Sequence, residues 1–140
     1  MRDNEGPGWA PPVLRDAGED DRDMYVVGVR ETTDPESWSL MFMECYDADD
    51  EQEIALGMDT YCVVVDPGQA THYGGVKECE ITGTELRLVL AEDAATALGM
   101  PSHARFALDL PLHQRELLGR GLRRVLTSGR ADAVPPLLRV

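Results

Sequence analysis

Apolar and polar residues alternate most regularly in the middle of the chain, between residues 57 and 90. Alternation with a period of two, broken by glycine, is typical of β-strands joined by tight turns. The pattern predicts three antiparallel strands, at residues 60–66, 71–81 and 85–90. Two adjacent glycines, Gly74 and Gly75, interrupt the second strand and indicate a bulge, a bend or the close approach of another backbone. We expect this stretch to form the core of a sheet.

The turn at Gly83-Thr84 fixes the register of the last two of these strands. A two-residue loop with glycine first has the twist of a β-hairpin turn. The resulting register pairs Thr82 with Glu85, Ile81 with Leu86, Cys79 with Leu88, and Glu80 with Arg87. It places apolar side chains on one face and a pair of opposite charges on the other. The hairpin is therefore predicted to have one buried face and one face in water.

The segments on either side of this stretch complete the fold. Further strands are predicted at residues 24–30, 39–46 and 103–110, and helices at residues 47–57, 91–101 and 111–127. The strand at 39–46 is apolar on both faces, which indicates a central position or a covering helix. With about six strands and two or three helices, the last near the C-terminus, the sequence predicts an α+β domain built on a mainly antiparallel sheet.

The two ends of the chain lack this regular apolar pattern. Residues 1–23 are rich in proline, glycine and acidic residues, and we expect an acidic, flexible leader. Within it, Trp9, Val13 and Leu14 are candidates for docking on the body. Residues 24–130 are expected to form a single α+β domain, and residues 131–140 a proline-containing tail that drapes over the body or reaches a neighbouring subunit.

The 140 residues carry a net charge of −13, and the acidic charge is concentrated in the first half. Residues 1–66 hold 18 acidic and 4 basic side chains, whereas residues 67–140 hold 8 acidic and 9 basic ones. Five arginines make the end of the last predicted helix basic: Arg115, Arg120, Arg123, Arg124 and Arg130. A negative field disfavours nucleic acid or an anionic membrane as a direct partner and favours a basic one. A purely solubilising surface is the alternative interpretation.

The sequence also indicates the cellular location of the protein. It has no apolar stretch of membrane-spanning length and no signal-peptide pattern, so we expect a cytoplasmic protein. Its three cysteines, Cys45, Cys62 and Cys79, are widely spaced within apolar runs. An odd number of cysteines in such positions favours reduced, buried thiols over disulfides.

Candidate catalytic and metal-binding residues are few. The three histidines are far apart in the sequence and form no HxH or HxxxH spacing, so no metal or other cofactor is predicted. The motifs GxSxG, GxGxxG and GxxxxGK[ST] are absent. Thr71, His72 and Tyr73 place a hydroxyl, an imidazole and a phenol beside the paired glycines, and they are the best candidate for a catalytic patch. Cys62 and Cys79 would be nucleophiles only if a basic neighbour lowered their pKa, and Lys77, on the same predicted strand face as Cys79, is the sole such neighbour. Buried packing is the favoured interpretation of both thiols.

The most charged segment begins at Asp47, and its alternating acids suggest a calcium loop. Asp47, Asp49 and Glu51 are spaced like the first ligands of an EF-hand. Gln52, however, stands where that loop requires glycine, and Met58 stands where it requires the bidentate glutamate. A solvated acidic surface is therefore the favoured interpretation, and an exposed segment of this kind would suit a basic partner.

Three blocks of sequence occur in a distinctive order: YC at 61–62, THYGGV at 71–76 and LRLVL at 86–90. In this order they resemble the immunity protein 10 family of bacterial polymorphic toxin systems. The resemblance covers about residues 24–127. The helix pattern AEDAATALGMP and the later GLRRVL agree with it, although both are common patterns. The leader and the tail lie outside it.

Proteins of this family are small and cytosolic, and they protect a toxin-producing cell by binding and neutralising the cognate toxin. The resemblance implies a non-enzymatic protein that occludes its toxin, and many toxins of such systems are nucleases with basic sites. Acidic residues would supply charge and aromatic residues would supply anchors at the centre of the interface. The contact residues expected on this basis are Tyr46, Asp47, Asp49, Asp50, Glu51, Glu53, His72 and Tyr73.

Two other functions are compatible with the same residues. An adaptor or homo-oligomeric interaction module, such as a homodimer, would use a similar surface without a toxin. A small enzyme or ligand carrier would require a pocket around His72 and Tyr73, and a flat, filled surface there would argue against it.

Overall fold

The computed structural model describes residues 10–44, 60–129 and 133–140, and the strands among them form two sheets. The first sheet contains, in spatial order, β1 (Asp16–Asp20), β2 (Val26–Arg30), β3 (Ser39–Met43), β4 (Cys62–Asp66) and β5 (Ala70–Tyr73). The second has the order β8-β7-β6-β9, from β6 (Val76–Thr82), β7 (Glu85–Leu90), β8 (His103–Ala107) and β9 (Leu137–Arg139). Neighbouring strands are antiparallel except β6 and β9, which are parallel.

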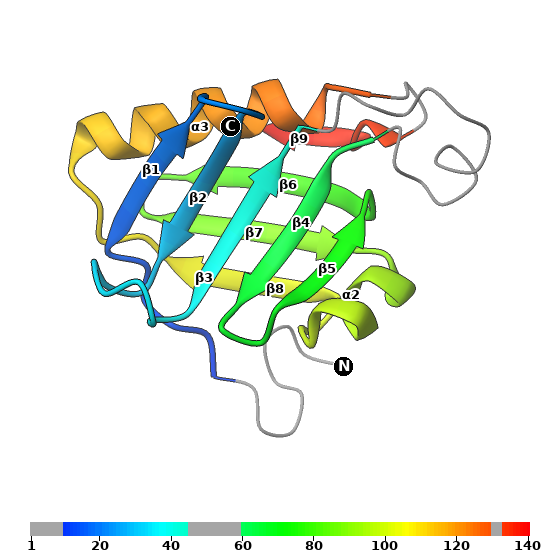
Figure 1. Cartoon of the computed structure of the whole chain (residues 1–140), viewed down its shortest axis with the longest axis horizontal. Coiled ribbons are helices and arrows are strands. Elements are labelled where there is room, and N and C mark those ends of the chain that lie inside the picture. The colour runs from blue at the N-terminus through cyan, green and yellow to red at the C-terminus, as the bar shows by residue number, and fades with distance from the viewer. Residues whose placement is uncertain (1–9, 45–59, 130–132) are drawn as a thin grey trace.

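The two sheets pack face to face, with the strands of one crossing those of the other (Figure 1). Side chains from both inner faces are almost completely buried between them. The first sheet contributes Val27, Val29, Leu40, Phe42, Val63 and Val65, and the second Cys79, Leu86, Leu88, Ala104 and Phe106. Successive residues of a strand point to opposite faces, so the apolar alternation in β2 and β3 directly produces this core.

Helix α3 (Leu112–Leu126) lies along one end of the two sheets, whereas α2 (Glu92–Leu98) lies beside β5 (Figure 1). Gly121 allows α3 to approach β2, because a Cβ at this position would lie 2.6 Å from Val27 Cγ2. The buried carboxylate of Glu44 accepts hydrogen bonds from Arg124 at 2.9 and 3.2 Å. An unpaired buried carboxylate would be strongly destabilising, so this pair ties the end of β3 to the helix.

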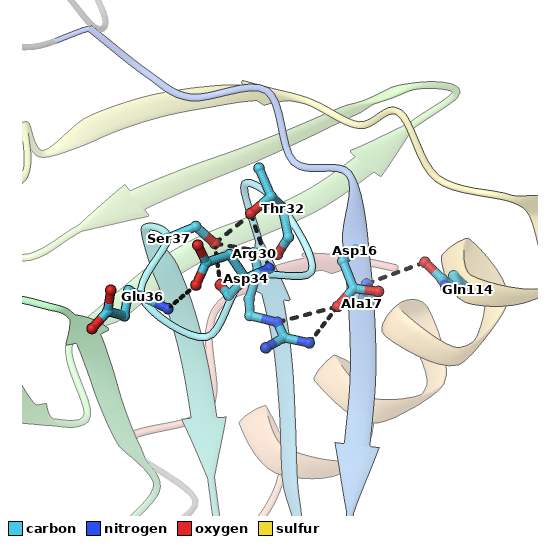
Figure 2. A network of polar contacts seen from close by, with 8 residues as sticks. All are labelled: Asp16, Ala17, Arg30, Thr32, Asp34, Glu36, Ser37 and Gln114. Carbon is cyan, nitrogen blue, oxygen red and sulfur yellow. Dashed lines mark hydrogen bonds and ion pairs between the residues drawn. The ribbon is translucent and has the colours of Figure 1, made fainter.

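Edge strand β1 is held by polar contacts on both of its sides (Figure 2). The Arg30 guanidinium donates to the Asp16 carboxylate at 2.6 Å, and the Ala17 amide donates to the Gln114 side chain of α3 at 3.2 Å. In the β2–β3 turn, the Thr32 hydroxyl accepts from the Asp34 amide at 3.0 Å. These contacts provide hydrogen-bond partners for polar groups of β1 and of the β2–β3 turn, which apolar side chains cannot do.

The chain passes from the first sheet to the second at Gly74 and Gly75. Both have positive φ values, +68° and +93°, and a Cβ on Gly75 would lie 2.5 Å from the Ala94 Cβ of α2. Tyr61 is fully buried at this corner, where its main-chain oxygen accepts from the Gly74 amide at 2.8 Å. Its hydroxyl accepts from the Val76 amide at 2.9 Å. Both glycines therefore supply the left-handed backbone of the turn, and at Gly75 a side chain would also not fit.

The α+β class and the mainly antiparallel pairing are confirmed, and so is every pair of the predicted hairpin register. The count of about six strands is wrong, because the described residues form nine. The predicted strand at 71–81 is two strands, β5 and β6, in different sheets. The predicted helix at 47–57 lies outside the described residues. Helices were expected at 91–101 and 111–127, and α2 and α3 occupy these positions.

Two strands lie in segments that the sequence assigned to the ends. β1 falls within the expected leader, and Leu14 just before it is fully buried. Its sequence, DAGED, is polar because an edge strand needs only a narrow apolar strip, here Ala17. β9 falls within the expected tail and pairs with β6 through three residues, too few for alternation to be visible in the sequence.

Replacing Gly75 by alanine is expected to destabilise the fold. Overpacking against Ala94 should cost roughly 1–3 kcal/mol of unfolding free energy, and the positive φ should add about 1 kcal/mol. Gly18→Ala is the matched control, since no atom lies within 4 Å of a Cβ there. Urea denaturation measures the unfolding free energy of both variants. Equal stability of the two would contradict this description of the corner.

Candidate partner-binding surface

The outward side chains of the first sheet lie in rows, because the antiparallel register aligns them across its five strands. We refer to these residues as the outer face. The first row is Asp20, Val26, Met43, Cys62 and Tyr73; the second is Gly18, Gly28, Met41, Val64 and Thr71; the third is Asp16, Arg30, Ser39 and Asp66. The first two rows are apolar at their centre, whereas the third is polar.

The outer faces of the two sheets differ in chemistry. On the second sheet, Arg87 contacts Glu78 at 2.8 Å and Glu80 at 3.3 Å, as expected for a face in water. On the first, Val26, Met41, Met43 and Val64 are half-buried and point away from the core. An antiparallel sheet with a wet face normally carries polar residues there. A contiguous apolar strip in that position is typical of a surface that another molecule covers.

A shallow depression lies over β1 and β2, where the outer face has no side chains at Gly18 and Gly28. Its volume is about 520 Å³, and Met41 and Val26 border it. Gly28 is required by packing, because a Cβ there would lie 2.9 Å from Met41 Cγ. A second hollow of about 620 Å³, lined by Val26, Met43 and the β1–β2 turn, adjoins it. Both are large enough to receive side chains of a partner.

Acidic residues border the apolar strip on the β1 side. Asp20 pairs with Arg22 at 2.7 Å, and the hydrogen bond from that guanidinium lowers the pKa of the Asp20 carboxyl to about 2. Asp20 is therefore ionised at any physiological pH. Glu19, Asp21 and Asp23 are exposed beside it. This margin is negative and complements a basic partner.

The structure separates the two described residues of the predicted contact set. Tyr73 belongs to the outer face, whereas His72 points inward in register with buried Val63. His72 Nδ1 lies 3.2 Å from the Gly74 main-chain oxygen, and Nε2 lies 3.6 Å from an Asp93 carboxylate oxygen of α2. Tyr46, Asp47, Asp49, Asp50, Glu51 and Glu53 lie outside the described residues.

The candidate catalytic patch is not assembled in the structure. Strand alternation sends Thr71 and Tyr73 to the face opposite His72, so these three side chains cannot line one pocket. A register shift between Val76 and Glu78 also leaves Lys77 exposed while Cys79 is fully buried. Burial raises the pKa of the Cys79 thiol to about 12. The structure therefore agrees with the favoured interpretation that Cys79 is a buried packing residue, and Lys77 does not activate its thiol.

The described residues contain neither a membrane-spanning helix nor a group of metal ligands. None of their helices is both long and apolar enough to cross a membrane. In the same part of the chain, no three His, Cys, Asp or Glu side chains are grouped so that they could hold a metal ion. Cys62 and Cys79 are both buried, as predicted.

Comparison with known families gives a match to the sequence model described as immunity protein 10, over residues 14–116. The chain belongs to the immunity protein 10 family. The resemblance found in the sequence is thus confirmed. No curated protein and no solved structure matches the chain. The match to the immunity protein 10 family contains all five strands of the first sheet, and hence the entire outer face, whereas it ends within α3 at Glu116.

Sequence reasoning missed most of the outer face. Gly18 and Asp20 were assigned to the leader, and Met41 and Met43 were interpreted as the second side of a central or helix-covered strand. β3 is indeed central, but its Met41 and Met43 face outward and are half-buried. The available signal was Gly28 in the run VVGVR, because a glycine within an apolar strand often marks a close approach.

The Cys79 thiol is expected to be unreactive in the native protein. A raised pKa keeps it protonated at pH 8, and burial excludes reagents. A Cys45→Ser/Cys62→Ser variant isolates this thiol for labelling with a chromogenic disulfide reagent. We expect negligible labelling in buffer and complete labelling in denaturant. Rapid labelling of the folded protein would contradict the assigned burial.

Proposed function

We propose that this immunity protein neutralises a cognate toxin by binding it with the outer face of the first sheet. Membership of the immunity protein 10 family supports a toxin partner. The observation that carries the choice of surface is the apolar strip of Val26, Met41, Met43 and Val64, which points away from the core. Burying such a strip against a partner removes apolar surface from water and favours association.

The proposed partner is a basic protein domain, such as a nuclease with a positively charged cleft. The net charge of −13 and the acidic margin at Glu19, Asp20, Asp21 and Asp23 support this choice. Complementary charge mainly accelerates association and rejects wrong partners, whereas the buried apolar centre provides affinity. The acidic segment from Asp47 to Glu53 connects β3 to β4, the central strands of the first sheet, and is proposed to add to this field.

The proposed mechanism is occlusion. A five-stranded antiparallel sheet is a rigid surface, so little conformational entropy is lost when it binds. A stable interface of standard size would cover about 800 Å² on each partner. Tyr73 would serve as an aromatic anchor, and the depression over Gly18 and Gly28 would receive a toxin side chain. In this proposal, the protein blocks the toxin's site by shape and charge without itself reacting.

A charge placed in the apolar strip should abolish protection. Met41→Glu/Val64→Glu is expected to weaken binding of the cognate toxin domain by at least about 100-fold, since it buries unpaired carboxylates. Calorimetry measures affinity, and growth of bacteria that co-express the toxin measures protection. Leu112→Glu is the control, because Leu112 is 62% exposed on α3, away from this face. Unchanged affinity in the double variant would exclude the outer face.

Filling the depression tests the same surface without introducing charge. Gly18→Leu meets no atom within 4 Å of its Cβ, so the fold should retain its stability. If a toxin side chain enters the depression, steric exclusion should weaken binding by about tenfold or more. Full affinity together with an unchanged melting temperature would show that the toxin does not use this depression.

A further inference from the structure

A basic groove runs along α3, apart from the residues of the outer face. Its volume is about 650 Å³, and Arg115, Arg120, Arg123 and Arg124 contribute to its walls. Ile81 at the end of β6 and Val140 after β9 also line it. Glu116 is the only acidic residue among the lining side chains. In a chain with a net charge of −13, such a concentration of guanidinium groups is a local reversal of charge.

Two of these arginines, Arg115 and Arg120, have no carboxylate partner among the described residues. Arg124 pairs with Glu44 and Asp21 at 2.9 and 3.6 Å, so its charge is compensated. Arg115, by contrast, donates to the main-chain oxygen of Gly83 at 3.1 Å, and a neutral acceptor leaves the positive charge in place. Arg123 donates at 2.8 Å to an oxygen of Val140, the last residue of the sequence, and its other N–H groups make no hydrogen bond among the described residues.

Other guanidinium donors of the groove, on Arg115 and Arg120, are not hydrogen-bonded within the described residues. In the described part of the chain, the Nε atom of Arg115 is buried without a hydrogen-bond partner, and Arg120 is exposed without an ion pair or hydrogen bond. The exposed donors of Arg120 are therefore available to form charge-assisted hydrogen bonds with an anion. Guanidinium groups also match carboxylates geometrically, because each can donate two parallel hydrogen bonds.

The spacing of the arginines indicates a ligand with several negative groups. A helix rises about 1.5 Å per residue, so Arg115 and Arg123 are separated by about 12 Å along the axis of α3. One small anion cannot contact both ends of this row. An extended polypeptide presents side chains of one face about 6.8 Å apart, so two or three carboxylates of such a segment would span it.

We propose that this groove binds an acidic polypeptide segment of a partner protein, with Arg120 and Arg123 pairing with its carboxylates. Ile81 and Gly119 also line the groove, so a peptide would contact apolar surface as well as charge. A nucleic acid fits less well, since a long polyanion would extend from the groove over the acidic surfaces. The Debye length is about 8 Å at physiological salt, so only a short segment experiences mainly the local positive field.

This site does not depend on the proposed toxin interface. Arg120, Arg123 and Val140 lie beyond residue 116, where the match to the immunity protein 10 family ends. The outer face is negative at its margin and takes a basic partner, whereas the groove is positive and takes an acidic one. Loss of either surface therefore leaves the other available for measurement.

Fluorescence anisotropy with a fluorescein-labelled peptide of alternating aspartate and alanine tests the proposal. Arg120→Gln/Arg123→Gln should raise the Kd of this peptide by about tenfold or more, because two charge-assisted pairs are lost. Arg15→Gln/Lys77→Gln removes the same charge from exposed positions elsewhere and should leave the Kd unchanged. Arg120→Gln alone breaks no contact of the described residues and should still weaken binding, which keeps the test valid if the double variant is unstable.

Three other probes define the ligand class: the same peptide with asparagine in place of aspartate, a single-stranded DNA oligonucleotide, and inorganic phosphate as a competitor. We expect the aspartate peptide to bind most tightly and phosphate to displace it poorly. Equal binding of the asparagine peptide, tighter binding of DNA, efficient displacement by phosphate, or equal effects of the two double variants would each overturn the proposal.

Discussion

The corner at Gly74 and Gly75 is the constraint on which the two-sheet arrangement depends. The chain leaves β5 and enters β6 there, with positive φ at both residues and with α2 in contact where a side chain would project. Tyr61 completes the corner by accepting the Gly74 and Val76 amides, so the turning backbone is buried without unpaired donors. The sequence around these glycines looked like a reactive patch, but its role in the structure is to set one sheet over the other.

The candidate surface follows from that arrangement. Once the sheets face each other, each keeps one outer face, and the pairing of Arg87 with Glu78 and Glu80 makes that of the second sheet suitable for water. The first sheet has instead placed valine and methionine outward in β2, β3 and β4. Within the immunity protein 10 family, a partner that covers this strip is the simplest physical reason for an apolar layer on the outside. The surface thus has an acidic margin beside the outer face and a separate basic groove along α3.

Local patterns predicted the parts of the fold that local forces determine. The Gly83-Thr84 turn and the alternation around it were sufficient for the hairpin register. In the structure, α2 ends at Leu98, where Gly99 adopts a left-handed conformation. The division of 71–81 between two sheets could not be predicted, because β5 and β6 have continuous strand character and only tertiary packing separates them. The opposite directions of His72 and Tyr73 follow from alternation alone. The outer face, in contrast, depends on which side of β3 the second sheet covers. Because β3 is apolar on both sides, its own sequence does not show which side this is.

Methionine oxidation footprinting of the complex with the cognate toxin domain would show directly whether a partner covers the outer face. Met41 and Met43 lie half-buried on the outer face, whereas Met100 is 7% exposed and serves as an internal reference. We expect toxin binding to slow strongly the oxidation of Met41 and Met43 by peroxide. Oxidation of Met100 should be slow in both the free and the bound protein. Equal oxidation of Met41 and Met43 in the free and the fully bound protein would contradict it.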